Sequence, residues 1–268
     1  MSVTTVTPDR PPPPTAADIE RRFGSPTVRI ARPVISAGLV GLRGVCRFNW
    51  TSRNLDAVTG VTPPFILASN HASHVDTAAI LGTLPPTLRE RTCVAAALDV
   101  FGPLERGRCG PIRSLRREFL QVTVAAGFRA FAFDRHGSSR RSLRAAVELV
   151  RHGWNLLLFP EGTRSRAGVI GPFKAGVAIV AKMTGRPVVP TYVQGGTTVL
   201  PCGTTIPRPG RVVTWYGTPL RLADGENAQE FTARVETRVR ELACRAAATV
   251  PDPPLAGVTA ADASPRRY

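Results

Sequence analysis

The stretch Asn-Leu-Leu-Leu-Phe-Pro-Glu-Gly-Thr-Arg-Ser, residues 155–165, joins an apolar run to a polar turn. The run at 155–159 predicts a buried strand, because it is short, apolar and followed by turn residues. Helical patterns stand on both sides of it, at Ser139–His152 and at Lys174–Thr184, and each is followed by a glycine. A strand between two helices favours an α/β fold with a mostly parallel sheet.

The same alternation extends over most of the chain. Further strands are predicted at Phe65–Ala68, Cys93–Leu98, Phe128–Phe133, Val188–Val193 and Val212–Tyr216, and further helices at Thr77–Leu84 and Gln229–Ala248. We therefore expect a single α/β sandwich domain with a mostly parallel central sheet flanked by helices, preceded by an N-terminal amphipathic helix. We place this domain at residues 27–249, between a flexible Pro-rich leader (1–26) and a disordered tail (250–268).

The segment 27–50 fits two interpretations. Its apolar stretch Val34–Leu42 is too short to span a bilayer, and arginines flank it on both sides. This pattern suits an amphipathic helix that lies on an anionic membrane surface. It equally suits an ordinary helix that packs against the core. The chain has no long uncharged apolar run of the kind that a transmembrane helix needs.

The chain is strongly basic, with 35 Lys and Arg against 19 Asp and Glu and a formal net charge of +16. About +14 of this charge lies in residues 34–249. This excess of positive charge favours polyanionic partners: phospholipid headgroups, nucleic acid or phosphorylated substrates. Aromatic residues make up only 6 % of the chain and are not interleaved with the Arg-rich run at 106–117, so we expect no nucleic-acid partner.

The five cysteines are scattered without a Cys-x-x-Cys pair. This spacing predicts neither a disulfide framework nor a zinc ribbon, and we expect no metal site. The N-terminal residues lack the apolar segment of a secretory signal, so a reducing, cytosolic setting is expected.

Polar residues follow three of the predicted strands. Residues 70–76 follow the first strand, Asp134 and Arg135 follow the strand at 128–133, and residues 160–165 follow the strand at 155–159. In open α/β folds, ligands bind beyond the carboxyl ends of the strands. We therefore expect these strand ends to be neighbours and to form one active site.

The first of these clusters contains a candidate acid–base pair. His71 on the turn and Asp76 on the first turn of the next helix can form a hydrogen bond between Nδ1–H and the carboxylate. That bond would leave Nε2 of His71 free to take a proton. Alternatively, Ser73 and Asp76 fit a capping box, and both roles are compatible. His74 has no acid at a matching offset and is expected to be a bystander.

Together, Asn70-His71-x4-Asp76 and Phe-Pro-Glu-Gly-Thr-Arg-Ser at 159–165 closely resemble the glycerolipid acyltransferase family, typified by lysophosphatidate (1-acylglycerol-3-phosphate) acyltransferases. Phe133-Asp134-Arg135 and the apolar run at 187–192 resemble two further blocks of that family. The resemblance extends from about Asn54 to Gly217 and keeps the order of the four blocks. It does not cover the N-terminal leader.

The resemblance implies transfer of an acyl group from a coenzyme A or acyl-carrier-protein thioester, as co-substrate and without a further cofactor, to an alcohol. His71 would be the general base, supported by Asp76. No covalent intermediate is expected, because the chain has no Gly-x-Ser-x-Gly nucleophile elbow. The acceptor would be a lysophospholipid or glycerol phosphate. From the basic charge, the short apolar segment Val34–Leu42 and a water-insoluble substrate, we expect a peripheral position on the cytoplasmic face of the cell membrane.

The substrate-binding residues implied by the resemblance are Arg135, Glu161, Gly162, Thr163 and Arg164. The two arginines could contact an acceptor phosphate through their planar guanidinium groups. Glu161 would bind acceptor hydroxyls or pair with an arginine, and Gly162 would let the backbone approach the substrate.

Three alternatives stay open. The Arg-rich segment 99–118 departs from the family pattern, so the acceptor could be a different lipid alcohol. The His71–Asp76 pair could equally serve a hydrolase with water as the nucleophile. The basic charge alone would also suit a non-catalytic module that binds membrane or nucleic acid.

Overall fold

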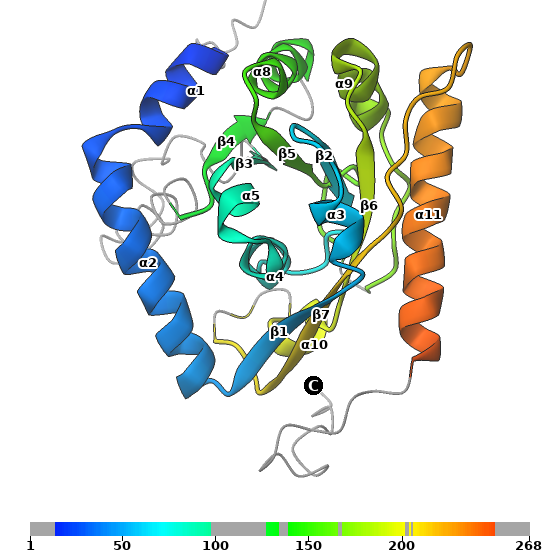
Figure 1. Cartoon of the computed structure of the whole chain (residues 1–268). Helices are drawn as coiled ribbons and strands as arrows, with labels where there is room; N and C mark the ends of the chain where they lie inside the picture. Colours follow the sequence, from blue (N-terminus) through cyan, green and yellow to red (C-terminus); the bar gives the residue numbers. More distant parts are fainter. Residues whose placement is uncertain are drawn as a thin grey trace, which may run out of the picture.

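A computed structural model of the chain describes residues 14–97, 127–133, 139–165, 168–201, 204 and 206–249. Within these residues a seven-stranded sheet has the order β1-β7-β6-β2-β5-β3-β4. All neighbouring strands pair in parallel except β6 and β7, which are antiparallel. Helices cover both faces (Figure 1), so the expected α/β fold with a mostly parallel sheet is confirmed.

The elements agree with most of the expected ranges. The strands are β1 (Phe48–Arg53), β2 (Ile66–Ser69), β3 (Thr92–Ala97), β4 (Ala130–Phe133), β5 (Asn155–Leu158), β6 (Val188–Gln194) and β7 (Gly210–Tyr216). The helices are α1 (Ala16–Phe23), α2 (Pro26–Val45), α3 (Asp56–Thr59), α4 (Val75–Thr83), α5 (Pro86–Glu90), α8 (Ser139–Arg151), α9 (Gly176–Thr184), α10 (Gly196–Val199) and α11 (Ala228–Ala248). The half-polar strand β1, which pairs with β7, was not predicted.

The apolar strands β2 and β5 lie side by side in the middle of the sheet and are buried on both faces. Leu156 belongs to a core cluster with residues of α1, α8, α9 and α11, whereas Leu157 packs on the other face with residues of α4. Burial on both faces explains why these strands read as continuous apolar runs. Because β2 and β5 are parallel neighbours, their carboxyl ends lie at the same edge of the sheet.

The N-terminal leader was predicted incorrectly for residues 14–26. Helix α1 begins with a reciprocal capping box between Thr15 and Asp18. Ile19 and Phe23 are buried, and the Phe23 ring contacts the Trp154 ring edge-on at 5.2 Å. Apolar residues at helical spacing thus dock α1 on the core and place this part of the chain within the domain. Residues 1–13 and the tail 250–268 lie outside the described residues.

Helix α2 is the expected N-terminal helix, and it is more exposed to solvent than a helix of the core. Among its 20 residues only Val28 is buried. The exposed apolar side chains on it are those of Ile30, Val34, Val40, Leu42 and Val45. Among the described helices, including α2, none combines the length and apolar character that crossing a membrane requires.

Candidate active site

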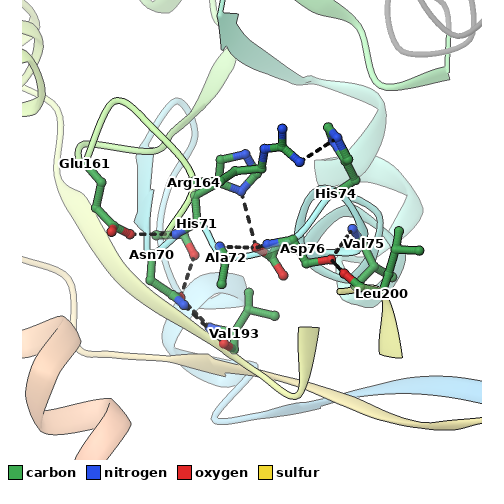
Figure 2. A network of polar contacts seen from close by, with 12 residues as sticks. Asn70, His71, Ala72, His74, Val75, Asp76, Glu161, Arg164, Val193 and Leu200 are labelled. Atoms are coloured by element: carbon green, nitrogen blue, oxygen red, sulfur yellow. Dashed lines mark hydrogen bonds and ion pairs between the residues drawn. The ribbon is translucent and has the colours of Figure 1, made fainter. Parts of the chain in front are cut away.

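His71 and Asp76 meet just beyond the carboxyl end of β2 (Figure 2). Nδ1 of His71 lies 3.3 Å from Oδ2 of Asp76, the interaction expected from their spacing. The Asp76 side chain is 1 % exposed, whereas 19 % of the His71 side chain is open to solvent. Within the part of the chain that the structure describes, Nε2 of His71 has no hydrogen-bond partner, so it is available to a substrate proton.

Asp76 also fixes the turn that carries the histidine. Its Oδ2 accepts the backbone N–H groups of Ala72 and Ser73, both at 2.7 Å. Ser73 Oγ in turn donates to the carbonyl of Leu200 at 2.7 Å. Asp76 therefore contacts the imidazole as predicted and forms one half of the predicted capping box, the bond from the N–H of Ser73. The reciprocal half is replaced, because Ser73 Oγ accepts the N–H of Val75 and the N-cap of α4 is His74.

Asn70 ties the end of β2 to the neighbouring strand β6. Its Oδ1 accepts the N–H of Val193 at 2.7 Å, and its Nδ2 donates to the carbonyl of the same residue at 3.2 Å. The side chain thus continues the pairing of β2 with β6, which ends at Ser69 and Thr191. The residue before the histidine is consequently held in register with the sheet.

Glu161, beyond the end of β5, holds His71 through its backbone. Oε1 of Glu161 accepts the N–H of His71 at 2.7 Å, and Oε2 accepts the N–H of Gly171 at 2.8 Å. The carboxylate is buried, and burial raises the pKa of Glu161 while the two backbone hydrogen bonds oppose that shift. Both carboxylate oxygens accept backbone N–H groups, whereas the sequence predicted that Glu161 binds acceptor hydroxyls or pairs with an arginine.

Phe159 supports the ring of the histidine. The His71 and Phe159 rings are stacked, with centroids 4.1 Å apart and planes 22° from parallel. The N–H of Ser165 also donates to the carbonyl of His71 at 2.8 Å. Residues 159–165 therefore contact His71 at its backbone N–H, its carbonyl and its ring.

Arg164 contacts His74, which was expected to be a bystander. Nη1 of Arg164 lies 2.8 Å from Nε2 of His74, at the start of α4 (Figure 2). Desolvation and the adjacent Arg164 guanidinium lower the pKa of His74 to about 4. The imidazole is then neutral near pH 7, and its Nε2 accepts the hydrogen bond from Arg164. His74 therefore positions Arg164, a role that no spacing rule indicated.

Gly162 and Thr163 lie on the turn between Glu161 and Arg164. Gly162 has a φ of 73°, and a Cβ there would lie 2.9 Å from Nζ of Lys174. Thr163 and Lys174 are exposed and line a cavity of about 440 Å³ next to Glu161. Lys174 had not been predicted as a site residue, although it is one of only two lysines in this arginine-rich chain.

The third strand end is not adjacent to the other two. β2 and β5 are neighbours, but β3 separates β5 from β4, so the expectation of three neighbouring strand ends is wrong. Arg135, which follows β4, lies outside the described residues.

Among the residues that the structure describes, no group of three or more His, Cys, Asp or Glu could hold a metal ion.

A buried aspartate, an imidazole whose Nε2 has no partner among the described residues and a nearby arginine lie together at the carboxyl edge of the parallel sheet, where ligands bind in open α/β folds. Comparison with known proteins identifies the class. The model of the Acyltransferase family matches residues 50–194, more than half of the chain. The chain belongs to the acyltransferase family.

The relatives found by sequence are named 1-acyl-sn-glycerol-3-phosphate acyltransferases. A chloroplastic 1-acyl-sn-glycerol-3-phosphate acyltransferase of Brassica napus is 46 % identical over 61 residues, which are 23 % of this chain and 18 % of that protein. The Bacillus subtilis protein of the same name is 29 % identical over 119 residues, which are 42 % of this chain and 57 % of that protein. The matched regions therefore span less than two thirds of these relatives.

The fold has a solved counterpart. The crystal structure of the 1-acyl-sn-glycerophosphate (LPA) acyltransferase from Thermotoga maritima aligns with a TM-score of 0.59. The alignment covers 86 % of this chain and 88 % of that one at 22 % identity. At this level of identity the match supports the fold.

Proposed function

We propose that this protein transfers an acyl group from a coenzyme A or acyl-carrier-protein thioester to the hydroxyl of a lysophospholipid or of glycerol phosphate. The observation that carries the proposal is the 3.3 Å contact between His71 Nδ1 and the buried Asp76, with Nε2 left open. Membership of the acyltransferase family and the activity for which the relatives are named support it.

In the proposed reaction, Nε2 of His71 takes the proton of the acceptor hydroxyl while the oxygen attacks the thioester carbonyl. The carbon–oxygen bond forms, the carbon–sulfur bond then breaks, and the imidazolium returns its proton to the departing thiolate. Asp76 stabilises the imidazolium and keeps the neutral ring in the tautomer that leaves Nε2 unprotonated. The reaction is balanced without a covalent enzyme intermediate.

We assign the acceptor phosphate to the cationic side of the site. Arg164 is held by His74, and Lys174 lines the cavity beside Glu161 together with Thr163. Arginine can contact a phosphate through two N–H groups at once, whereas lysine acts as a point charge. Arg135 stays a further candidate for the same phosphate. Glu161, with both oxygens on backbone N–H groups, is assigned to positioning His71 instead.

The test is an assay of the purified protein with an acyl-CoA series, following thioester loss with and without lysophosphatidate. His71→Ala should lower the rate by about 10²–10⁴, the usual cost of losing a general base. The matched control is His152→Ala, because this exposed histidine contacts Glu20 away from the site. Wild-type turnover by the His71→Ala protein would disprove the mechanism.

We also propose that the protein binds peripherally to an anionic membrane surface on the cytoplasmic side. The basic charge of the chain and the five exposed apolar residues of α2 support this assignment. Binding to vesicles that contain phosphatidylglycerol should weaken as salt rises, because salt screens exposed charges. Binding that is insensitive to salt would instead indicate that apolar insertion alone holds the protein.

A further inference from the structure

A second cavity lies between α2 and α4, and no residue of the candidate active site lines it. Its volume is about 280 Å³. Four arginines line it: Arg32 and Arg43 from α2, Arg89 from α5, and Arg129 just before β4. The other lining residues are mainly apolar. We call this cavity the arginine groove.

The walls of the arginine groove fit together closely. A Cβ at Gly82 would lie 2.5 Å from the indole nitrogen of Trp50, and a Cβ at Gly127 would lie 2.9 Å from Cγ2 of Ile35. These distances are shorter than ordinary contacts, so only glycine lets β1 approach α4, and α2 approach the segment before β4, this closely. Glycines at both contacts make the groove part of the packed fold rather than a gap beneath a loose helix.

Two of its arginines carry buried donors without an acceptor. Nε and Nη1 of Arg129, and Nε of Arg43, are buried and have no hydrogen-bond partner among the described residues. Arg43 is otherwise engaged, since it donates to Oδ1 of Asn49 and lies over the Trp50 ring at 4.1 Å. The guanidinium of Arg129 lies over the Trp154 ring, 5.5 Å from its centroid. Buried donors of this kind normally have partners, so the groove is short of an acceptor.

The charges around Arg129 are predominantly positive. Burial lowers the pKa of Arg129 to about 10, and the neighbouring Arg32 and Arg91 shift it in the same direction. Glu90 raises the pKa of both Arg32 and Arg129, but it forms no ion pair with either among the described residues. One exposed carboxylate beside several guanidinium groups leaves a site with a net positive charge, which favours an anion.

The lining also indicates what kind of anion fits. Leu39, Leu81 and Phe128 give the groove apolar walls, which a free inorganic anion does not use. Val40 lines the groove and is also one of the exposed apolar residues of α2. Val40 is therefore the point at which the groove meets the exposed apolar residues of α2.

We propose that the arginine groove binds an anionic membrane phospholipid, with the phosphate on Arg129 and Arg32 and the first carbons of an acyl chain against the apolar walls. The site extends the proposed membrane association and is independent of the acyl-transfer chemistry. Guanidinium groups suit this ligand because they form charge-assisted hydrogen bonds to phosphate oxygens. The phosphate would supply the acceptors that the buried nitrogens of Arg129 lack.

Titration calorimetry with dihexanoylphosphatidylglycerol, below its critical micelle concentration, tests the proposal without vesicles and without turnover. The wild-type protein should bind it, and Arg129→Gln should weaken binding about tenfold or more, the effect of losing a hydrogen bond between charged groups. Arg245→Gln is the matched control: it removes one charge from the exposed end of α11, on the opposite side of the molecule from α2 (Figure 1). It should bind like the wild type.

Further measurements show at which site the lipid binds and which part of the lipid is recognised. Arg164→Gln should leave the affinity unchanged, because the active site is a different place. Inorganic phosphate should bind at least about tenfold more weakly than the lipid, since it makes no apolar contact. If Arg129→Gln does not fold, Arg32→Gln carries the same expectation. Equal binding by wild type and the groove variants, loss of binding in Arg164→Gln, or phosphate binding as tight as lipid binding would each overturn the proposal.

Discussion

Glu161→Gln keeps the size of the side chain but leaves it one acceptor oxygen in place of two. In the native site the two carboxylate oxygens accept the N–H groups of His71 and Gly171, at 2.7 and 2.8 Å. A glutamine can accept only one of them and turns its own N–H₂ toward the other. A hydrogen bond to a charged group contributes about 1.5–3 kcal/mol. Burial raises the pKa of Glu161, so desolvation offsets part of this energy and we expect a loss of about 1.5 kcal/mol of unfolding free energy.

Thermal denaturation and steady-state kinetics together distinguish positioning from substrate binding. For a domain of this size, that loss should lower Tm by roughly 3–6 °C. Because the His71 backbone would shift, kcat should fall while the acceptor KM changes little. The control is Glu241→Gln, which removes only a surface ion pair with Arg238 and should cost less than about 1 kcal/mol. An unchanged Tm with a raised acceptor KM would show that Glu161 binds the acceptor.

Three other substitutions test the surroundings of the site. Arg164→Ala should reduce kcat/KM for a phosphorylated acceptor by about 1.5–3 kcal/mol and spare thioester hydrolysis, and equal losses for an unphosphorylated acceptor would contradict a phosphate role. The pKa of His74 is about 4 in the folded protein and about 6.5 when unfolded, so the unfolded chain binds more protons between these values and Tm should fall on acidification through this window. His74→Gln should flatten that Tm profile, whereas an unaltered profile would locate the acid sensitivity elsewhere. Gly196→Ala would place a Cβ against Oδ1 of Asp76 and should destabilise the fold by about 1–3 kcal/mol, measurable by urea unfolding; unchanged stability would show that the site has room.

The pairing of His71 with Asp76 could be predicted because it is local. Both residues lie on one strand-to-turn-to-helix unit, and the position of α4 follows from a short apolar pattern. The proximity of residues 159–165 was also predictable, since two buried parallel strands end at the same edge of a sheet. The sequence could not indicate that Glu161 binds the N–H of Gly171, because a backbone donor in a loop leaves no mark in the residue pattern.

The errors also have physical causes. The order of the strands depends on long-range packing, and nothing in the local pattern showed that β3 would lie between β5 and β4. Helix α1 was assigned to a flexible leader because a proline run precedes it and only a few apolar residues mark its buried face. Strand β1 is half polar and lies at the edge of the sheet, where alternation is weak and burial is partial.

The contacts of His71 explain why two strings of sequence, distant along the chain, form one site. Asp76 contacts Nδ1, Glu161 accepts the backbone N–H, Ser165 donates to the carbonyl, and Phe159 stacks on the ring. Each contact uses a different part of the histidine, and among the described residues none of them engages Nε2, the nitrogen that we propose takes the substrate proton. A base held in this way loses little entropy when the acceptor binds, which is the condition for efficient proton transfer. Residues 159–165 therefore act on the proposed chemistry through the position of His71 as well as through any contact with the acceptor.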